Sequence, residues 1–140
     1  MERNSMSSRT LLCLTADTDV RDSIAEMLYQ HYSEHKLVFA PNGFQGVTCI
    51  EKLKPDIFIV DSDMPAYDYA LVLDKISAFN KANKSITFTT CHDDGVAGLS
   101  YYITKPINFE IFRVKLDRAI KTLDESSPDI FNKAKAAFFK

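Results

Sequence analysis

The segment Pro55-Asp56-Ile57-Phe58-Ile59-Val60-Asp61-Ser62-Asp63-Met64-Pro65 decides the fold of this 140-residue chain. Its apolar run, residues 57–60, is β-branched and aromatic and follows a Pro-Asp turn signal, which is typical of a strand buried on both faces of a parallel sheet. Asp61 lies at the carboxyl end of this predicted strand, where open α/β sheets place their ligand sites. A carboxylate there needs a cation or hydrogen-bond donors. The sequence therefore suggests a reactive or metal-binding acid, with a helix N-cap or a turn aspartate as the alternative.

Length and composition fit a single domain with one core. Hydrophobic residues make up 46% of the chain, and the net charge of −2 offers no basic face for nucleic acid. No stretch approaches the length of a membrane span, and the polar opening of the chain lacks the apolar region of a signal peptide. Three scattered cysteines are too few for a disulfide framework, so we expect reduced thiols and a cytoplasmic protein.

Apolar runs alternate with helical repeats along the chain. Five short runs have the length and composition of buried strands: residues 11–14, 37–40, 57–60, 86–90 and 101–103. Four segments carry apolar residues at helical spacing: 20–28, 44–50, 69–79 and 109–123. Residues 92–100 make a poor helix because they contain Gly95 and Gly98. The alternation favours the α/β class, with a parallel sheet wound on both sides.

The same pattern divides the chain into three parts. We expect a flexible leader over residues 1–9, the domain itself over 10–124 and an amphipathic helical extension over 125–140. Pro128 suits the first turn of a helix in that extension. Phe131 and Phe138 lie on its apolar side, and burying a large apolar side chain stabilises by roughly 1.5–3 kcal/mol. We therefore expect the extension to pack on its own domain or on a second subunit, as in a homodimer.

Polar groups lie at the carboxyl ends of four predicted strands. They are the loop 15–19, Asp61, Thr90 and Lys105. Parallel strands with right-handed crossovers bring these ends together along one edge of the sheet. A carboxylate, a hydroxyl and an ammonium that converge there could handle a phosphoryl group. The acid would accept the group, the lysine would act as a point charge, and the hydroxyl would hydrogen-bond an oxygen.

Over residues 10–124 the chain resembles the receiver domain of bacterial two-component response regulators. The resemblance rests on Pro55-Asp56, on residues 61–65, on Thr90, on Thr104-Lys105-Pro106 and on the turn 40–43. It implies a flavodoxin-like five-stranded parallel sheet of order 2-1-3-4-5. It also implies roles for four side chains: Asp61 as phosphoacceptor, Thr90 as switch hydroxyl, Lys105 as site lysine and Tyr102 as switch aromatic. Such a domain is not itself an enzyme, and its partner is a histidine kinase or a downstream effector protein.

The chain departs from the family at its metal site. The paired acids that bind Mg²⁺ in the family fall on Thr15 and Ala16. Mg²⁺ is usually held by one or two carboxylates together with phosphate oxygens. With Asp61 left, and only Asp17 or Asp63 to compensate, we expect a weak or absent Mg²⁺ site and slow phosphoryl transfer.

Two further departures concern the backbone. Thr90 and Lys105 lie closer in sequence than is usual by roughly seven residues, about two helical turns, so the fourth helix of the family is expected to be shortened or lost. Ala66 and Tyr69 replace glycines that are common after the Met-Pro turn, so that loop must follow another path.

Two functional interpretations follow from these departures. In the first, which they favour, the protein is an atypical or pseudo-receiver that signals as a protein-interaction module without phosphorylation. In the alternative, it is an ordinary receiver that a histidine kinase phosphorylates on Asp61. A flavin-binding enzyme of similar topology is disfavoured, because the strand-end loops lack the glycines or hydroxyls that a phosphate needs.

Two structural expectations accompany the favoured interpretation. Lys105 should lie within salt-bridge reach of Asp61. Partners should bind through Tyr101 or Tyr102, which point in opposite directions from one strand, and through an exposed side of the last helix around Arg113, Lys115 and Asp117.

Overall fold

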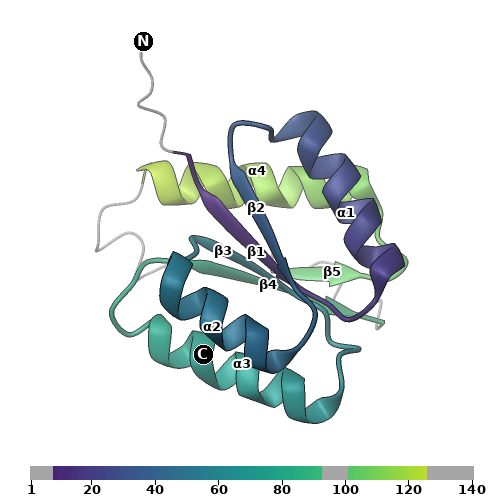
Figure 1. The fold of residues 1–140 in the computed structure, drawn as a ribbon. Helices are drawn as coiled ribbons and strands as arrows, with labels where there is room; N and C mark the ends of the chain where they lie inside the picture. The colour runs from purple at the N-terminus through teal and green to yellow at the C-terminus, as the bar shows by residue number, and fades with distance from the viewer. Residues whose placement is uncertain (1–7, 93–100, 126–140) are drawn as a thin grey trace.

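The computed structural model describes residues 8–92 and 101–125 (Figure 1). Its elements follow in the order β1 (Thr10–Leu14), α1 (Thr18–His31), β2 (Lys36–Ala40), α2 (Gly43–Leu53), β3 (Ile57–Val60), α3 (Ala66–Phe79), β4 (Ile86–Cys91), β5 (Tyr102–Thr104) and α4 (Phe109–Glu125). The strands form one parallel sheet in the order β2-β1-β3-β4-β5. The predicted α/β fold with strand order 2-1-3-4-5 is confirmed.

Three of the expectations concern residues outside the described ranges. The shortened or lost fourth helix falls on residues 93–100, most of the leader on 1–7, and the C-terminal extension on 126–140. Within the described ranges, no helix combines the length and apolar character that crossing a membrane requires.

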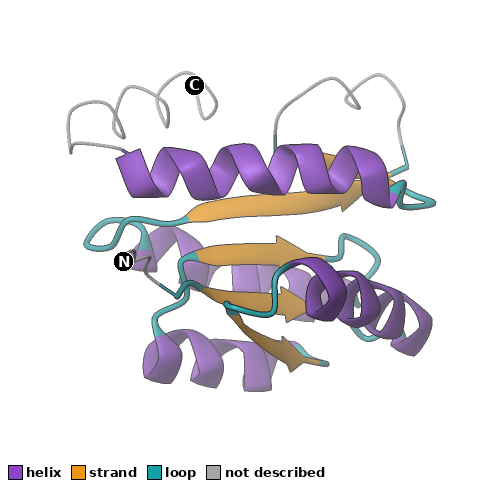
Figure 2. Cartoon of the chain, turned by 90° about the horizontal axis from the view of Figure 1, so that it is seen from above, coloured by secondary structure: helices purple, strands orange, loops and turns teal. Residues whose placement is uncertain are grey.

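The strand β3 is the centre of the core because helices cover both of its faces (Figure 2). Ile57 and Ile59 pack into a cluster with side chains of α1 and α4, whereas Phe58 and Val60 pack into a second cluster with side chains of α2 and α3. All four side chains are essentially fully buried. This two-sided burial explains why the run contains no polar residue, and it places Asp61 at the point where the strand leaves the core.

The helix α3 begins earlier than its apolar pattern indicates. The expected start was Tyr69, but the helix starts at Ala66, directly after Pro65. The backbone N–H of Tyr69 donates to the carbonyl of Pro65 at 2.9 Å, which closes the first turn. Ala66 and the residues after it lack the freedom of the family's glycines, so the chain enters the helix immediately after the Met-Pro turn.

Arg9, just before β1, also contacts the rest of the domain. Although the sequence places Arg9 in the predicted leader, its guanidinium pairs with Asp124 at 2.6 Å and with Asp56 at 3.5 Å. Its backbone N–H donates to Nδ1 of His35 at 2.8 Å. These contacts tie the end of α4 to the amino-terminal edge of the sheet, where β1 begins.

The helix α2 approaches β1 and α3 closely at Gly46. A Cβ atom at this position would lie 2.5 Å from Cδ2 of Leu14 and 3.2 Å from Cγ2 of Val72, and both of these side chains are fully buried. We expect Gly46→Ala to lower the free energy of unfolding by about 1 kcal/mol, since overpacking of roughly 1–3 kcal/mol exceeds the gain in helix propensity. Urea unfolding measures the effect, with Gln45→Ala on the exposed side of α2 as the control. A Gly46→Ala variant as stable as the wild type would contradict this packing.

Candidate functional site

Asp61 lies where the carboxyl ends of four strands meet, and protein donors hold both of its carboxylate oxygens. Its side chain is 3% exposed. Lys105, just after β5, donates from Nζ to Oδ1 at 2.6 Å. Thr15, just after β1, donates from Oγ1 to Oδ2, also at 2.6 Å. Oδ1 further accepts the backbone N–H of Asp63 at 3.0 Å and Oγ1 of Thr90, at the end of β4, at 3.2 Å. The expected ion pair between Lys105 and Asp61 is therefore present, within a set of four donors.

Lys105 joins Asp61 to a second carboxylate. Its Nζ also donates to Oδ2 of Asp63 at 2.7 Å, and its side chain is 12% exposed. The same Asp63 oxygen lies 2.8 Å from Nε2 of His92. The sequence pattern did not indicate His92, because nothing in the local sequence relates it to Asp63. The result is a chain of polar contacts from the buried Asp61 to the exposed His92.

The charges of Asp61 and Lys105 stabilise each other. Burial acts to raise the pKa of Asp61, but hydrogen bonds from Lys105, from Thr15 and from the Asp63 backbone outweigh it and lower that pKa below its ordinary value. Burial acts to lower the pKa of Lys105, but Asp61 and Asp63 raise it above its ordinary value. The stabilisation is lost as the pH falls through the lowered pKa of Asp61, and also as the pH rises through the raised pKa of Lys105.

The Thr90 hydroxyl is engaged as both acceptor and donor. It accepts the backbone N–H of Ser62 at 2.9 Å and donates to Asp61. Its side chain is fully buried. Because an O–H group has one proton, this proton is used on Asp61 in the resting site. Thr90 is therefore one of the four hydrogen-bond donors to the Asp61 carboxylate in the resting site.

The carboxylates expected near a metal ion have other partners. Asp17 is the N-cap of α1, and its Oδ1 accepts the backbone N–H groups of Asp19 and Val20 at 2.8 and 3.2 Å. Oδ2 of Asp63 is engaged with Lys105 and His92. Among the described residues, no group of three or more His, Cys, Asp and Glu side chains could hold a metal ion. These residues are therefore a poor fit to the paired-acid Mg²⁺ site of the receiver family.

The two tyrosines at β5 point in opposite directions, as expected. The Tyr101 ring packs edge-to-face on Phe88 with centroids 5.8 Å apart. Tyr102 is 37% exposed and lies on the other face of the sheet. Of this pair, Tyr102 is the one that presents its ring toward solvent.

The prediction that Arg113, Lys115 and Asp117 form one partner-binding surface on the last helix is wrong. The Tyr32 hydroxyl donates to Oδ1 of Asp117 at 2.5 Å, and its oxygen lies 3.3 Å from the Arg113 carbonyl oxygen, so this side of α4 faces α1. Lys115 instead donates from Nζ to the Tyr102 carbonyl at 2.6 Å, toward β5. Residues two positions apart lie on nearly opposite sides of a helix, so the three residues cannot form one surface.

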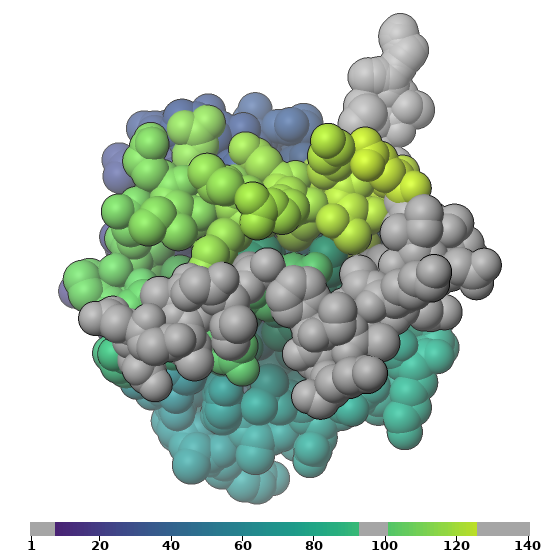
Figure 3. All heavy atoms as spheres, turned by 180° about the vertical axis from the view of Figure 1, so that it is seen from behind, coloured from purple at the N-terminus to yellow at the C-terminus, as the bar shows by residue number. Residues whose placement is uncertain are grey.

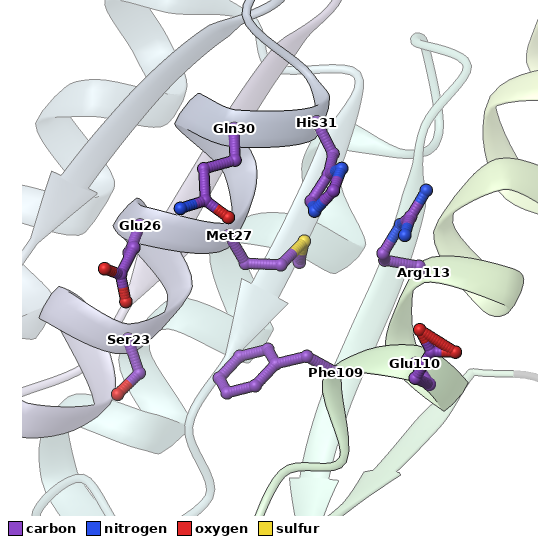
Figure 4. A pocket seen from close by; sticks show the side chains of 8 residues that line it. All are labelled: Ser23, Glu26, Met27, Gln30, His31, Phe109, Glu110 and Arg113. Atoms are coloured by element: carbon purple, nitrogen blue, oxygen red, sulfur yellow. The ribbon is translucent and has the colours of Figure 1, made fainter.

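A groove of about 250 Å³ lies between α1 and the start of α4 (Figure 4). Its lining residues are Ser23, Glu26, Met27, Gln30, His31, Phe109, Glu110 and Arg113. None of them belongs to the cluster around Asp61. The sequence pattern did not reveal this groove because its two walls come from helices that are far apart along the chain.

Comparison with known proteins gives matches to receivers. No protein-family model matches the chain. The chain is 28% identical over 115 residues to the probable C4-dicarboxylate response regulator DctR of Priestia megaterium, a match that covers 78% of this chain and 50% of that protein. The chain thus spans half the length of this curated relative.

Solved receiver structures share the fold. The signal receiver domain of an HD domain-containing protein from Pseudomonas fluorescens Pf-5 matches with a TM-score of 0.69 at 16% identity, covering 86% of this chain and all of that one. The receiver domain of the response regulator Ssk1 from Saccharomyces cerevisiae, solved with the histidine phosphotransfer protein Ypd1, matches with a TM-score of 0.68 at 15% identity, covering 83% and 91% of the two chains. The strand order and the structural matches together show that the described part of the chain has the fold of response-regulator receiver domains.

Proposed function

We propose that this receiver domain acts in signalling as a protein-interaction module that does not require phosphorylation of Asp61. The observation that supports the proposal is that both oxygens of the Asp61 carboxylate accept hydrogen bonds from side chains at 2.6 Å. A carboxylate attacks phosphorus through a lone pair on one of these oxygens, and each hydrogen bond that the oxygen accepts makes it less nucleophilic. Charge-assisted hydrogen bonds of this length stabilise the resting anion and lower its reactivity. The resting site therefore disfavours attack of the Asp61 carboxylate on a phosphoryl donor.

The charge balance around Asp61 supports the same proposal. Phosphoryl transfer depends on positive charge that neutralises the donor and the transferred group, and Mg²⁺ supplies much of that charge. Thr15 and Ala16 are uncharged, and Asp17 caps α1. Lys105 already neutralises Asp61 at 2.6 Å. A Mg²⁺ ion that approached Asp61 would meet the Lys105 ammonium and the Thr15 hydroxyl, and we infer that it binds weakly or not at all.

The alternative is an ordinary phosphoacceptor receiver. One observation supports this alternative: the carboxylate of Asp61, the ammonium of Lys105 and the hydroxyl of Thr90 converge at one site. Under this alternative the partner is a histidine kinase or a phosphotransfer protein, of the kind that binds the receiver domain of Ssk1. Under the favoured proposal the partner is a protein that binds the resting domain.

A Mg²⁺ titration of the full chain, followed by the backbone amide NMR shifts of Asp61, Ser62 and Asp63, tests the proposal. We expect no saturation in the sub-millimolar range. Asp61→Asn provides the second arm: it should leave signalling activity in the host unchanged, as should the control Asp74→Asn on the exposed side of α3. Saturable shifts at sub-millimolar Mg²⁺, together with loss of signalling in Asp61→Asn alone, would return the protein to the ordinary phosphoacceptor class.

A further inference from the structure

The two faces of the β4–β5 edge of the sheet differ in character. Toward α1 and α4 the two strands contribute Ile86, Phe88 and Ile103 to a buried apolar cluster. Side chains alternate along a strand, so the opposite face carries the residues between them. That face, which we term the open face, consists of Thr87, Thr89, Cys91, Tyr102 and Thr104, all of them half-buried or exposed.

The helices described on this side of the sheet do not extend their core over the open face. Residues of β1, β2, β3, α2 and α3 form the apolar cluster there, and in residues 8–92 and 101–125 that cluster includes no residue of β4 or β5. In the view from behind, the green-to-yellow residues of α4 lie above the teal residues of α3 (Figure 3). Parallel sheets are almost always covered on both faces. The open face therefore calls for a cover.

The connection between β4 and β5 is shorter than a crossover that carries a covering helix. Strand β4 ends at Cys91 and β5 begins at Tyr102. A parallel crossover that carries a helix generally needs a dozen or more residues. The chain between these strands falls short of that length, whereas a typical receiver places a full helix there.

The described chain ends close to the start of β4. The Leu123 carbonyl, near the end of α4, accepts Nζ of Lys84 at 3.2 Å. Lys84 lies two residues before β4 begins at Ile86. The described chain therefore ends, at Glu125, near the amino-terminal end of β4. From there, a helix over residues 128–139 would extend roughly 18 Å, close to the length of β4 at about 3.3 Å per residue.

The sequence of this last segment suits an apolar surface. At helical spacing, its apolar side falls on Ile130, Phe131, Ala134, Ala137 and Phe138. The open face offers threonine methyl groups and the Tyr102 ring, and the half-buried Tyr69 of α3 lies near that ring. Burial and the neighbouring Tyr102 raise the pKa of Tyr69, in keeping with the closeness of the two rings.

We propose that residues 127–139 of the same chain dock as an amphipathic helix along the open face of β4 and β5. The segment thereby takes the place that the fourth helix of a typical receiver would occupy. A partner that binds Tyr102 would then have to bind or displace this segment first. The proposal goes beyond the state of Asp61 and holds for either functional class.

The alkylation rate of a cysteine placed on the open face measures whether residues 127–139 cover that face. The reporter is Thr89→Cys in a full-length chain that also carries Cys49→Ser and Cys91→Ser, while Cys13 stays buried. We expect slow alkylation by a maleimide in this parent chain. Phe131→Asp with Phe138→Asp should accelerate it severalfold, because carboxylates on the apolar side of the helix oppose docking. The matched control, Asn132→Asp with Ala136→Asp, adds the same two carboxylates to the opposite side of the helix and should alkylate like the parent.

Two outcomes would overturn the proposal. Equal alkylation rates in all three chains would show that the segment does not cover Thr89. Protection that disappears on dilution would show that a second copy supplies the segment. Thermal unfolding of the chain without the reporter is an independent check: the Phe131/Phe138 pair of changes should lower Tm and the control pair should not.

Discussion

Replacing Lys105 with alanine is expected to lower the free energy of unfolding by about 3 kcal/mol, because breaking a buried ion pair from one side leaves an uncompensated charge. Asp61 would keep its bonds to Thr15, Thr90 and the Asp63 backbone but lose its cation. The matched control is Lys75→Ala, which removes an ion pair of similar length, 2.7 Å to Glu51, on an exposed surface. That control should change stability little. Urea unfolding at neutral pH measures the free energy of unfolding of both variants. Equal losses in the two would contradict a buried, stabilising ion pair between Lys105 and Asp61.

The pH dependence of the Lys105→Ala variant gives a second readout. In the wild type, Asp61 has a lowered pKa, so its contribution to stability is present above the ordinary pKa of an aspartate and is lost in acid. Without Lys105, burial dominates and should raise the pKa of Asp61. The stability gap between the two proteins should therefore narrow as the pH falls, because protonation removes the uncompensated charge. An NMR titration of the Asp61 carboxyl carbon that is unchanged in the variant would contradict the pairing.

Restoring the acidic pair should create a metal site. We expect Thr15→Asp with Ala16→Asp to increase Mg²⁺ affinity at least about tenfold, or 1.4 kcal/mol, because carboxylate number sets the affinity of hard cations. Without metal, the added charges beside Asp61 should raise its pKa and lower stability. Thr15→Asn with Ala16→Asn has the same shape without the charge and serves as the control. Calorimetric titration measures the affinities, and a doubly acidic variant that binds Mg²⁺ no better than this control would show that the backbone lacks the required geometry.

The fold was predictable because its signals are local. The run 57–60 is apolar on both faces, so it had to lie inside a parallel sheet, and the acids and hydroxyls at strand ends had to meet at one edge. This reasoning brings Lys105 to Asp61, where the structure places it. The roles of these residues in phosphoryl chemistry stay predictions.

The contacts that close the site were not predictable from local pattern. The sequence shows only that Thr15 replaces a charged acid of the family, yet its hydroxyl donates one of the two shortest hydrogen bonds to Asp61. That bond depends on how β1 and β3 pair in register, with Leu14 opposite Val60. The contact of His92 with Asp63 and the start of α3 at Ala66 likewise depend on how the strand-end loops fold.

The most direct test of the central claim is the intact mass of the chain after incubation with Mg²⁺ and a small-molecule phosphoryl donor such as acetyl phosphate. Our account predicts that the wild type gains no phosphoryl group on Asp61, because Lys105 and Thr15 donate hydrogen bonds to both carboxylate oxygens. The Thr15→Asp, Ala16→Asp variant, treated in parallel, should become labelled if a metal site is what the wild type lacks. Stoichiometric labelling of the wild type that Asp61→Asn abolishes would contradict the account.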